Sequence, residues 1–297
     1  ERFSTKGLGK LTHYLGIEVD QSDGSIVLSQ RQYVDKILAA FNMTDCNPVS
    51  EPLSPSLRLT KSMCPSTDAE RERMKEYPVR QAIGALMYLS ICTRPDISHS
   101  VRDVARFCSN PGFEHWQAVQ RIIRYVRGTR DLSLRYSPSN LGFFGFCDSN
   151  FAQCPDTSRS VSGSVFLLAN CAVSWTSSSQ KRVAVSTTEA EYYAAFWGAK
   201  QCMFLRQLLQ DLCFPLDGAT PLLGDNRGCV LMANNPGARK RTKHIRYKYH
   251  MARELVEEGD ISVNRVPKEV QLADIFTKNV DARSLQTMRS DMMGVSA

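Results

Sequence analysis

The chain has 297 residues, a hydrophobic content of 42% and a formal net charge of +7 at pH 7. This length exceeds the roughly 100–200 residues of one hydrophobic core, so we expect a large domain with a smaller companion. Ten cysteines without a Cys-x-x-Cys pair and five scattered histidines argue against a zinc site or a small disulfide framework. The lack of such a framework favours a reducing, intracellular location, and we expect a cytoplasmic protein.

Neither a membrane span nor a signal peptide is expected. The longest apolar runs, at residues 84–92 and 165–173, are shorter than the ~20 residues that a membrane helix needs. Residues 1–11 show no signal-peptide core. We therefore expect no membrane partner.

The N-terminal segment predicts a hairpin, a helix and a connector. Two β-rich runs flank Asp23-Gly24, which is a hairpin signal. Apolar residues at helical spacing predict a helix in residues 31–43, with Ser29 available as its cap. The Pro- and Ser-rich residues 48–68 predict an extended, poorly structured connector, where we place a domain boundary.

Three short helices are predicted between residues 77 and 130, because proline precedes and glycine follows the periodic runs. In the third helix Arg121, Arg124, Arg127 and Arg130 recur every third residue. This basic stripe has two interpretations, a surface that follows a phosphate backbone and an ordinary solvated face.

After Leu132 the chain changes to strand patterns and then to alternating helices and strands. We predict strands in residues 132–138, 141–149, 160–170, 172–178, 220–225 and 261–267, and helices in 187–212, 226–235, 242–259 and 270–278. Antiparallel strands followed by strand–helix alternation predict an α/β fold, in which a mixed sheet carries helices on its faces.

Four acidic residues give the clearest chemical signal: Asp148, Glu191, Asp225 and Asp274. Asp148 follows an apolar strand, where open α/β sheets place ligands. Each residue has a plain alternative, since Asp148 is also typical of a turn, Asp225 of a helix cap and Asp274 of a helix N-terminus. Together they suit two Mg²⁺ or Mn²⁺ ions about 3.5–4 Å apart, a site type that hydrolyses phosphodiesters.

Glu189 and Glu191 are expected to differ in role, because two residues along a helix point about 200° apart. Ser186 and Glu189 match a capping box, in which Glu189 turns back to the N-cap amide. Glu191 instead shares its face with small and apolar residues, where a carboxylate is costly unless it is paired or bound to a metal.

A basic cluster is a candidate nucleic-acid surface. Between Arg239 and Arg253 lie seven basic residues and no acidic one. This local excess predicts a surface that faces a polyanion, although a solvated helix face is the alternative.

The ordered motifs resemble the end of a copia-type LTR retrotransposon polyprotein, over about residues 7–280. Its ribonuclease H domain is matched by FCDSNFA, SWT, STTEAEYYAA, GDN, RTKHI and QLADIFTK. The end of its reverse transcriptase and the connection behind it are matched by YLGIEV, VLSQRQYVDKIL, GALMYLS, TRPDI and RYVRGT.

The resemblance implies a ribonuclease H-like α/β fold, a five-stranded mixed sheet flanked by helices. A small α+β/helical remnant of the reverse-transcriptase thumb and connection would precede it. We predict a reverse-transcriptase remnant of hairpin and helix in residues 1–55, a helical connection in 56–135, the ribonuclease H-like domain in 136–280 and a tail in 281–297.

The resemblance also implies an activity, the metal-dependent hydrolysis of the RNA strand of an RNA–DNA hybrid. In it, Asp148 bridges two Mg²⁺ or Mn²⁺ ions, Glu191 and Asp225 complete one ion site, and Asp274 holds the second ion. The candidate nucleic-acid contacts are Lys240, Arg241, Lys243, His244 and Lys248. His244 is either a proton-transfer group or a structural or phosphate-contacting residue.

Some positions depart from the family pattern. The sequence contains no Asp-Asp pair, so we expect no DNA synthesis by this chain alone and name the rest of the reverse transcriptase as a partner. Asn150-Phe151 and Arg227-Gly228 replace more usual pairs without removing a metal ligand. The alternative function is a non-catalytic, nucleic-acid-binding transposon remnant.

Overall fold

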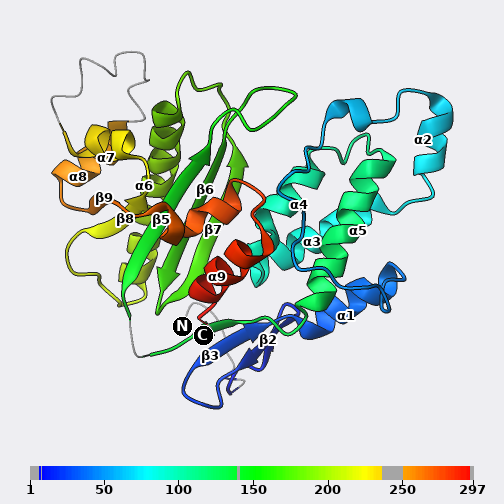
Figure 1. Cartoon of the computed structure of the whole chain (residues 1–297). Coiled ribbons are helices and arrows are strands. Elements are labelled where there is room, and N and C mark those ends of the chain that lie inside the picture. Colours follow the sequence, from blue (N-terminus) through cyan, green and yellow to red (C-terminus); the bar gives the residue numbers. More distant parts are fainter. Residues whose placement is uncertain (1–6, 8, 139–140, 236–249, 295–297) are drawn as a thin grey trace, which may run out of the picture.

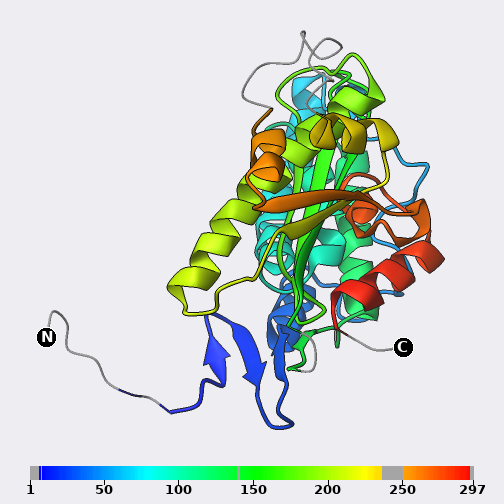
Figure 2. The same ribbon diagram turned by 90° about the vertical axis from the view of Figure 1, so that its left-hand side faces the viewer.

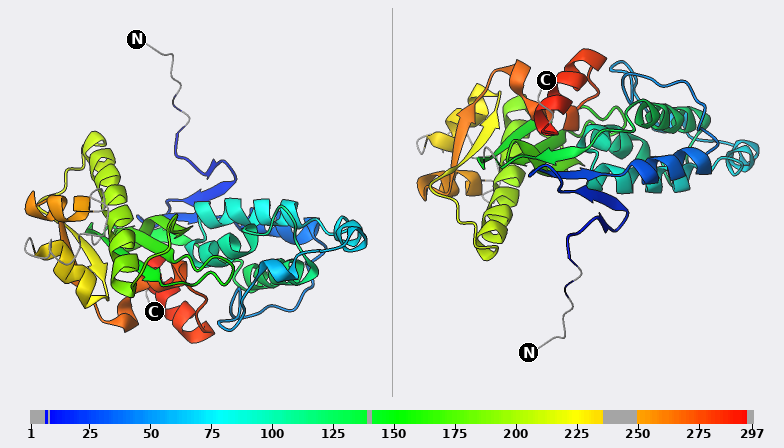
Figure 3. Two further views of the ribbon diagram at one scale, coloured as in Figure 1. Left: turned by 90° about the horizontal axis from the view of Figure 1, so that it is seen from above. Right: turned by 90° about the horizontal axis from the view of Figure 1, so that it is seen from below.

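Two β-sheets organise this computed structural model, which describes residues 7, 9–138, 141–235 and 250–294 (Figure 1). The larger sheet has the strand order β7-β6-β5-β8-β9, and the smaller one the order β1-β2-β3-β4. Seen from above and below, the larger sheet with its helices lies beside a second, helical part of the chain (Figure 3).

The larger sheet is mixed, as predicted. It consists of β5 (Phe143–Asn150), β6 (Val161–Leu168), β7 (Cys171–Ser179), β8 (Thr220–Gly224) and β9 (Ile261–Arg265). Strands β5, β6 and β7 are antiparallel neighbours, whereas β8 pairs parallel to β5 and β9 parallel to β8. The central strand β5 is therefore flanked by one antiparallel and one parallel partner.

Helices cover both faces of this sheet. The long helix α6 (Thr187–Asp211) runs along one face with α7 (Arg227–Asn234) and α8 (Met251–Glu257) packed against it. The 3-10 turn η6 (Leu272–Phe276) and α9 (Ala282–Met292) lie on the opposite side (Figure 2). The predicted helix in residues 270–278 is thus wrong, because this short segment folds as two 3-10 turns, η5 (Lys268–Val270) and η6.

The smaller sheet joins the two ends of the helical part. It consists of β1 (His13–Tyr14), β2 (Ile17–Asp20), β3 (Ile26–Ser29) and β4 (Leu134–Tyr136), all antiparallel. The hairpin predicted around Asp23-Gly24 is confirmed in β2 and β3, with the Ser25 amide donating to the Asp23 carboxylate at 3.0 Å.

The helical part comprises α1 (Arg31–Ala40), α2 (Asp68–Met74), α3 (Val79–Cys92), α4 (Ser98–Ala105) and α5 (Phe113–Gly128), with the short 3-10 turns η1 (Lys61–Met63) and η2 (Pro95–Ile97). The three helices predicted between residues 77 and 130 are confirmed. The predicted cap of α1 is wrong, because its N-cap position is Gln30 and the Ser29 hydroxyl instead donates to the Glu18 carboxylate at 3.3 Å.

The connector in residues 48–68 is largely non-helical, as predicted, but it is not loose. Leu53 and Leu59 are each only 1% exposed, since they pack into the core of the helical part. The proline and serine content predicted the lack of regular structure, and the two buried leucines hold the segment against the core.

The basic stripe of α5 binds the protein's own chain. Its four guanidinium groups pair as follows: Arg121 with the Glu51 carboxylate at 3.0 Å, Arg124 with the Asn47 carbonyl at 2.7 Å, Arg127 with the Cys46 carbonyl, and Arg130 with the Asp35 carboxylate at 2.6 Å. Neither predicted interpretation describes this role, because these arginines fasten α1 and residues 46–51 to α5 and to the turn after it.

One apolar core extends from Val34 to Met293 and includes buried residues of the helical part and of the η6 face of the larger sheet. A second core lies between the sheet and α6, α7 and α8. The three boundaries between the four predicted domains stay predictions, and the first core contains residues from both sides of each boundary. None of the helices in the described residues is long and apolar enough to span a membrane.

Candidate metal-binding active site

Three of the four predicted carboxylates converge. Ligand oxygens of Asp148, Glu191 and Asp225 all lie within 4.8 Å of one another. They come from three elements, namely the end of β5, the first turns of α6 and the residue after β8. A group of oxygen ligands at this spacing suits a hard divalent cation such as Mg²⁺ or Mn²⁺.

Strand pairing explains why the site forms at this end of the sheet. Strands β5 and β8 pair at Gly145–Leu222 and Phe146–Leu223, whereas β5 continues to Asn150 beside β6 alone. Asp148 thus lies beyond the last paired residues of the two parallel strands. Open α/β sheets place their ligands at such carboxyl ends.

The start of α6 selects Glu191 over Glu189, as predicted. The Ser186 hydroxyl accepts a hydrogen bond from the Glu189 amide at 3.1 Å, while the Glu189 carboxylate accepts one from the Val185 amide at 2.8 Å. The expected capping box is therefore displaced by one residue on its carboxylate side. Glu189 is occupied by this cap, so Glu191 is the carboxylate that joins Asp148 and Asp225.

Two glycines allow the flanking elements to approach the sheet closely. A Cβ atom at Gly198 of α6 would lie 2.1 Å from the Cys147 Sγ atom on β5. A Cβ atom at Gly163 of β6, which pairs with Asp148, would lie 2.8 Å from side-chain atoms of Phe276 and Thr277. The missing side chains thus let α6 and η6 converge on the carboxylates from opposite faces.

The fourth carboxylate, Asp274, stands apart from the group of three. Its Oδ2 atom forms an ion pair with the Lys278 Nζ atom at 2.7 Å. Its Oδ1 atom is buried and has no hydrogen-bond partner among the described residues. Asp274 is nevertheless close enough to Asp148 for its negative charge to raise the pKa of the Asp148 carboxyl group.

Two residues that the sequence analysis did not identify hold Asp148 in place. The Thr277 hydroxyl donates a hydrogen bond to the Asp148 Oδ2 atom at 2.5 Å. The fully buried Gln271 donates from Nε2 to the carbonyl of Cys147, the residue before Asp148, at 3.0 Å. Only the position of Gln271 and Thr277 beside Asp274 in the QLADIFTK motif offered a signal for them.

Burial and mutual repulsion perturb the carboxyl groups. Asp148 is 4% exposed, and desolvation followed by the Asp274 charge raises its pKa. The pKa of Glu191 is raised by desolvation and then by the charges of Asp148 and Asp225. Carboxylates held this close ionise together only when a cation compensates them. The residues therefore fit a bound divalent metal, which the unpartnered Asp274 oxygen also supports.

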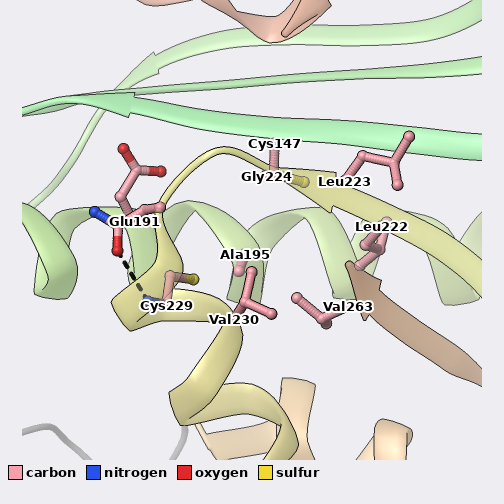
Figure 4. A pocket seen from close by; sticks show the side chains of 10 residues that line it. Cys147, Glu191, Ala195, Leu222, Leu223, Gly224, Cys229, Val230 and Val263 are labelled. Carbon is pink, nitrogen blue, oxygen red and sulfur yellow. Dashed lines mark hydrogen bonds between the residues drawn. The ribbon is translucent and has the colours of Figure 1, made fainter. Parts of the chain in front are cut away.

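A cavity of about 20 Å³ borders the stem of Glu191 (Figure 4). Its lining is mainly apolar and includes Ala195, Leu222, Val230 and Val263. The carboxyl group of Glu191 points away from these side chains in Figure 4. The cavity is too small for a nucleotide, so it is a packing void beneath the site and not a substrate pocket.

The predicted nucleic-acid contacts Lys240, Arg241, Lys243, His244 and Lys248 lie outside the described residues. Of the basic cluster, Arg253 is described, and it is 4% exposed. Its guanidinium donates to the Met232 carbonyl at 2.9 Å, in the last turns of α7. Arg253 is therefore a buried structural residue, and the predicted polyanion surface does not include it.

Comparisons with known proteins show which proteins this chain resembles in sequence. Residues 1–55 match the family model described as reverse transcriptase (RNA-dependent DNA polymerase). The chain is 39% identical over 280 residues to the retrovirus-related Pol polyprotein from transposon TNT 1-94 of Nicotiana tabacum, covering 94% of this chain and 21% of that protein. It is 35% identical over 292 residues to the Pol polyprotein from transposon RE1 of Arabidopsis thaliana, covering 98% and 19%.

Among solved structures, the chain is similar to the N-terminal ribonuclease H domain of a Mycobacterium tuberculosis protein. The sequences are 16% identical, the match covers 50% of this chain and 96% of that one, and the TM-score is 0.32.

The chain belongs to the Pol polyproteins of copia-type retrotransposons, and it spans about a fifth of the length of these relatives. The predicted α/β fold is confirmed in its five-stranded mixed sheet with flanking helices, which is the arrangement that the resemblance implied.

Proposed function

We propose that this chain is a ribonuclease H-type endonuclease that hydrolyses the RNA strand of an RNA–DNA hybrid. The observation that carries the proposal is the convergence of Asp148, Glu191 and Asp225 within 4.8 Å, next to Asp274. Burying carboxylates that repel one another is costly unless a cation compensates their charge, and a bound metal ion would do so.

Asp148, Glu191 and Asp225 would hold a divalent ion, and Asp274 would contribute to a second one. Bound Mg²⁺ or Mn²⁺ supplies an activated water and stabilises the leaving oxygen of an in-line displacement. Thr277 fixes the rotation of the Asp148 carboxylate through its hydrogen bond. Asp225 is only half-buried, so the group faces the surface from which a nucleic acid would approach.

The substrate contacts are part of the same proposal. The 2′-hydroxyl group distinguishes RNA from DNA at the cleaved strand. Lys240, Arg241, Lys243 and Lys248 would contact phosphates without reading sequence, and His244 would lie at the substrate edge. Such contacts predict binding that weakens steeply with salt. In the longer polyprotein, the remaining reverse transcriptase would be the partner of this chain.

The test uses an RNA–DNA hybrid labelled on either strand, with Mg²⁺, with Mn²⁺ and with chelator. The variant is Asp148→Asn, and the matched control is Asp217→Asn, which removes an exposed carboxylate at the opposite end of β8 from Asp225. Metal-dependent cutting of the RNA strand that only Asp148→Asn abolishes supports the proposal. Equal cutting by Asp148→Asn refutes the site assignment.

The second candidate is a non-catalytic transposon remnant that binds nucleic acid. The same experiment separates it from the enzyme. Salt-dependent binding of the hybrid without cutting in either metal favours the remnant, and Asp148→Asn should then bind as well as the parent or slightly better, because it removes a negative charge beside the phosphates.

A further inference from the structure

Lys278 lies at the candidate active site but belongs to neither the predicted metal ligands nor the predicted nucleic-acid contacts. Its ammonium group is 2.7 Å from the Asp274 Oδ2 atom, and its side chain is 30% exposed. The residue before it, Thr277, donates to Asp148. Lys278 thus extends from the segment that supports both aspartates.

The two oxygens of Asp274 have different environments. Lys278 neutralises Oδ2, whereas Oδ1 is buried without a hydrogen-bond partner among the described residues. A buried carboxylate oxygen without a partner is costly. Asp274 is therefore only half satisfied by the ion pair, and it retains an oxygen that a bound cation would satisfy.

The charges of the site make Lys278 a competitor of a metal ion. One divalent ion within the group of three, together with Lys278, leaves the four carboxylates with a single net negative charge. A second divalent ion at Asp274 would bring the ammonium group close to a like charge. Like charges this close repel, and the partial exposure of Lys278 reduces this repulsion without removing it. Lys278 on the Oδ2 atom therefore opposes an ion at the Oδ1 atom, and the second ion binds more tightly once Lys278 leaves Asp274.

We propose that Lys278 is a resident cation that holds Asp274 until a second divalent ion replaces it. The ions then bind in order, the first at Asp148, Glu191 and Asp225, and the second, more weakly, at Asp274. This inference rests on the proposed function, because it concerns the metal content of the same site.

The side chain of Lys278 is suited to this exchange. A lysine ammonium is a compact charge on a flexible four-carbon stem. The ion pair runs from Asp274 within η6 to Lys278, four residues later, and the partly exposed stem can rotate toward solvent without moving the backbone. Once it is released, the ammonium group remains beside the site, where it can contact a substrate phosphate. Lys278 is therefore a positioning residue for Asp274.

The test counts Mn²⁺ ions by electron paramagnetic resonance in the whole chain, without nucleic acid. The parent should bind one ion tightly and a second at least tenfold more weakly. Lys278→Met, which keeps the stem length and removes the charge, should tighten the second ion at least tenfold and leave the first nearly unchanged. Lys278→Arg should behave as the parent, and Asp274→Asn should lose the second ion only.

Circular dichroism and thermal melting confirm that each variant is folded before ions are counted. In chelator, Lys278→Met should melt at a lower temperature than Lys278→Arg, because Asp274 loses its counter-charge. Two ions of equal affinity in the parent, or an unchanged second ion in Lys278→Met, overturn the inference while leaving the nuclease proposal intact. Absence of any specific Mn²⁺ binding to the folded parent overturns both.

Discussion

Replacing Gly198 with alanine should separate the two elements that carry Asp148 and Glu191. The new Cβ atom would lie 2.1 Å from the Cys147 Sγ atom, whereas ordinary van der Waals contact begins near 3.4 Å. Helix α6 must therefore retreat from β5 by about 1.3 Å, the difference between these distances, or Cys147 must change rotamer within a packed core. Glu191 lies two helical turns from Gly198 and would move with the helix.

Overpacking of this kind costs about 1–3 kcal/mol of unfolding free energy. Gly84→Ala is the matched control, because Gly84 lies within helix α3 and a Cβ atom there meets nothing within 4 Å. Both variants gain about 0.5–1 kcal/mol from better helix propensity, so the comparison isolates the steric term. The melting temperature of Gly198→Ala should lie roughly 2–12 °C below that of Gly84→Ala.

The assay is thermal unfolding with chelator, followed by hybrid cleavage with Mg²⁺. Displacement of a catalytic group by about 1 Å lowers the rate by up to ~100-fold. The cleavage rate should therefore fall further than the loss of folded protein alone would explain. Cys147→Ala removes the clashing sulfur and leaves the Cys147 Cβ atom at 3.6 Å, so the double variant should recover most of the loss. Equal melting of Gly198→Ala and Gly84→Ala would refute the packing argument.

Three further predictions concern the site and the arginines of α5. Without divalent ions, the melting temperature should fall as the pH rises above the ordinary carboxyl pKa values of 3.8 and 4.5. The raised pKa values of Asp148 and Glu191 in the folded state stabilise it below the unfolded-state pKa, and this stabilisation is lost as the pH rises through the folded-state pKa. Addition of Mg²⁺ should restore the melting temperature. Thr277→Val should lower cleavage about 10–100-fold while Thr277→Ser retains it, measured with the same hybrid. Arg127→Gln should lower the melting temperature without changing hybrid affinity, whereas Lys243→Gln should reduce the salt slope of binding by about 1. A flat pH profile, full activity of Thr277→Val, or weaker hybrid binding by Arg127→Gln would contradict the respective argument.

Local sequence patterns were enough to predict the parts of the site that local structure determines. Asp148 was assigned from an apolar strand that ends there, and Glu191 from its face on a long helix, and both are among the converging carboxylates. These patterns have clear periods, two for a strand and 3.6 for a helix, so residue faces follow from spacing. Asp225 was assigned from its position at the end of a short strand, directly before a helix.

Patterns failed where contacts between distant segments decide the structure. The helix predicted around Asp274 is a 3-10 turn, in which the Gln271 side chain accepts from the Ala273 amide and the turn packs onto Gly163. The arginine stripe of α5 looked free because its partners, such as Asp35, lie up to 95 residues away in sequence. Spacing along one helix carries no information about such partners.

The helical part of the chain supports the fourth carboxylate. The segment after η6 is tied to α4, where the Ser100 hydroxyl donates to the Asn279 side chain at 3.3 Å. Helix α9 is tied to α5, since the Arg289 guanidinium donates to the Tyr125 hydroxyl at 3.0 Å. Glu191 and Asp225 instead depend on the sheet and α6, while Asp148 lies on the sheet and also accepts the Thr277 hydrogen bond. A disturbance of α4 or α5 should therefore act on Asp274, on Lys278 and on the Thr277 hydrogen bond to Asp148 before it reaches Glu191 and Asp225.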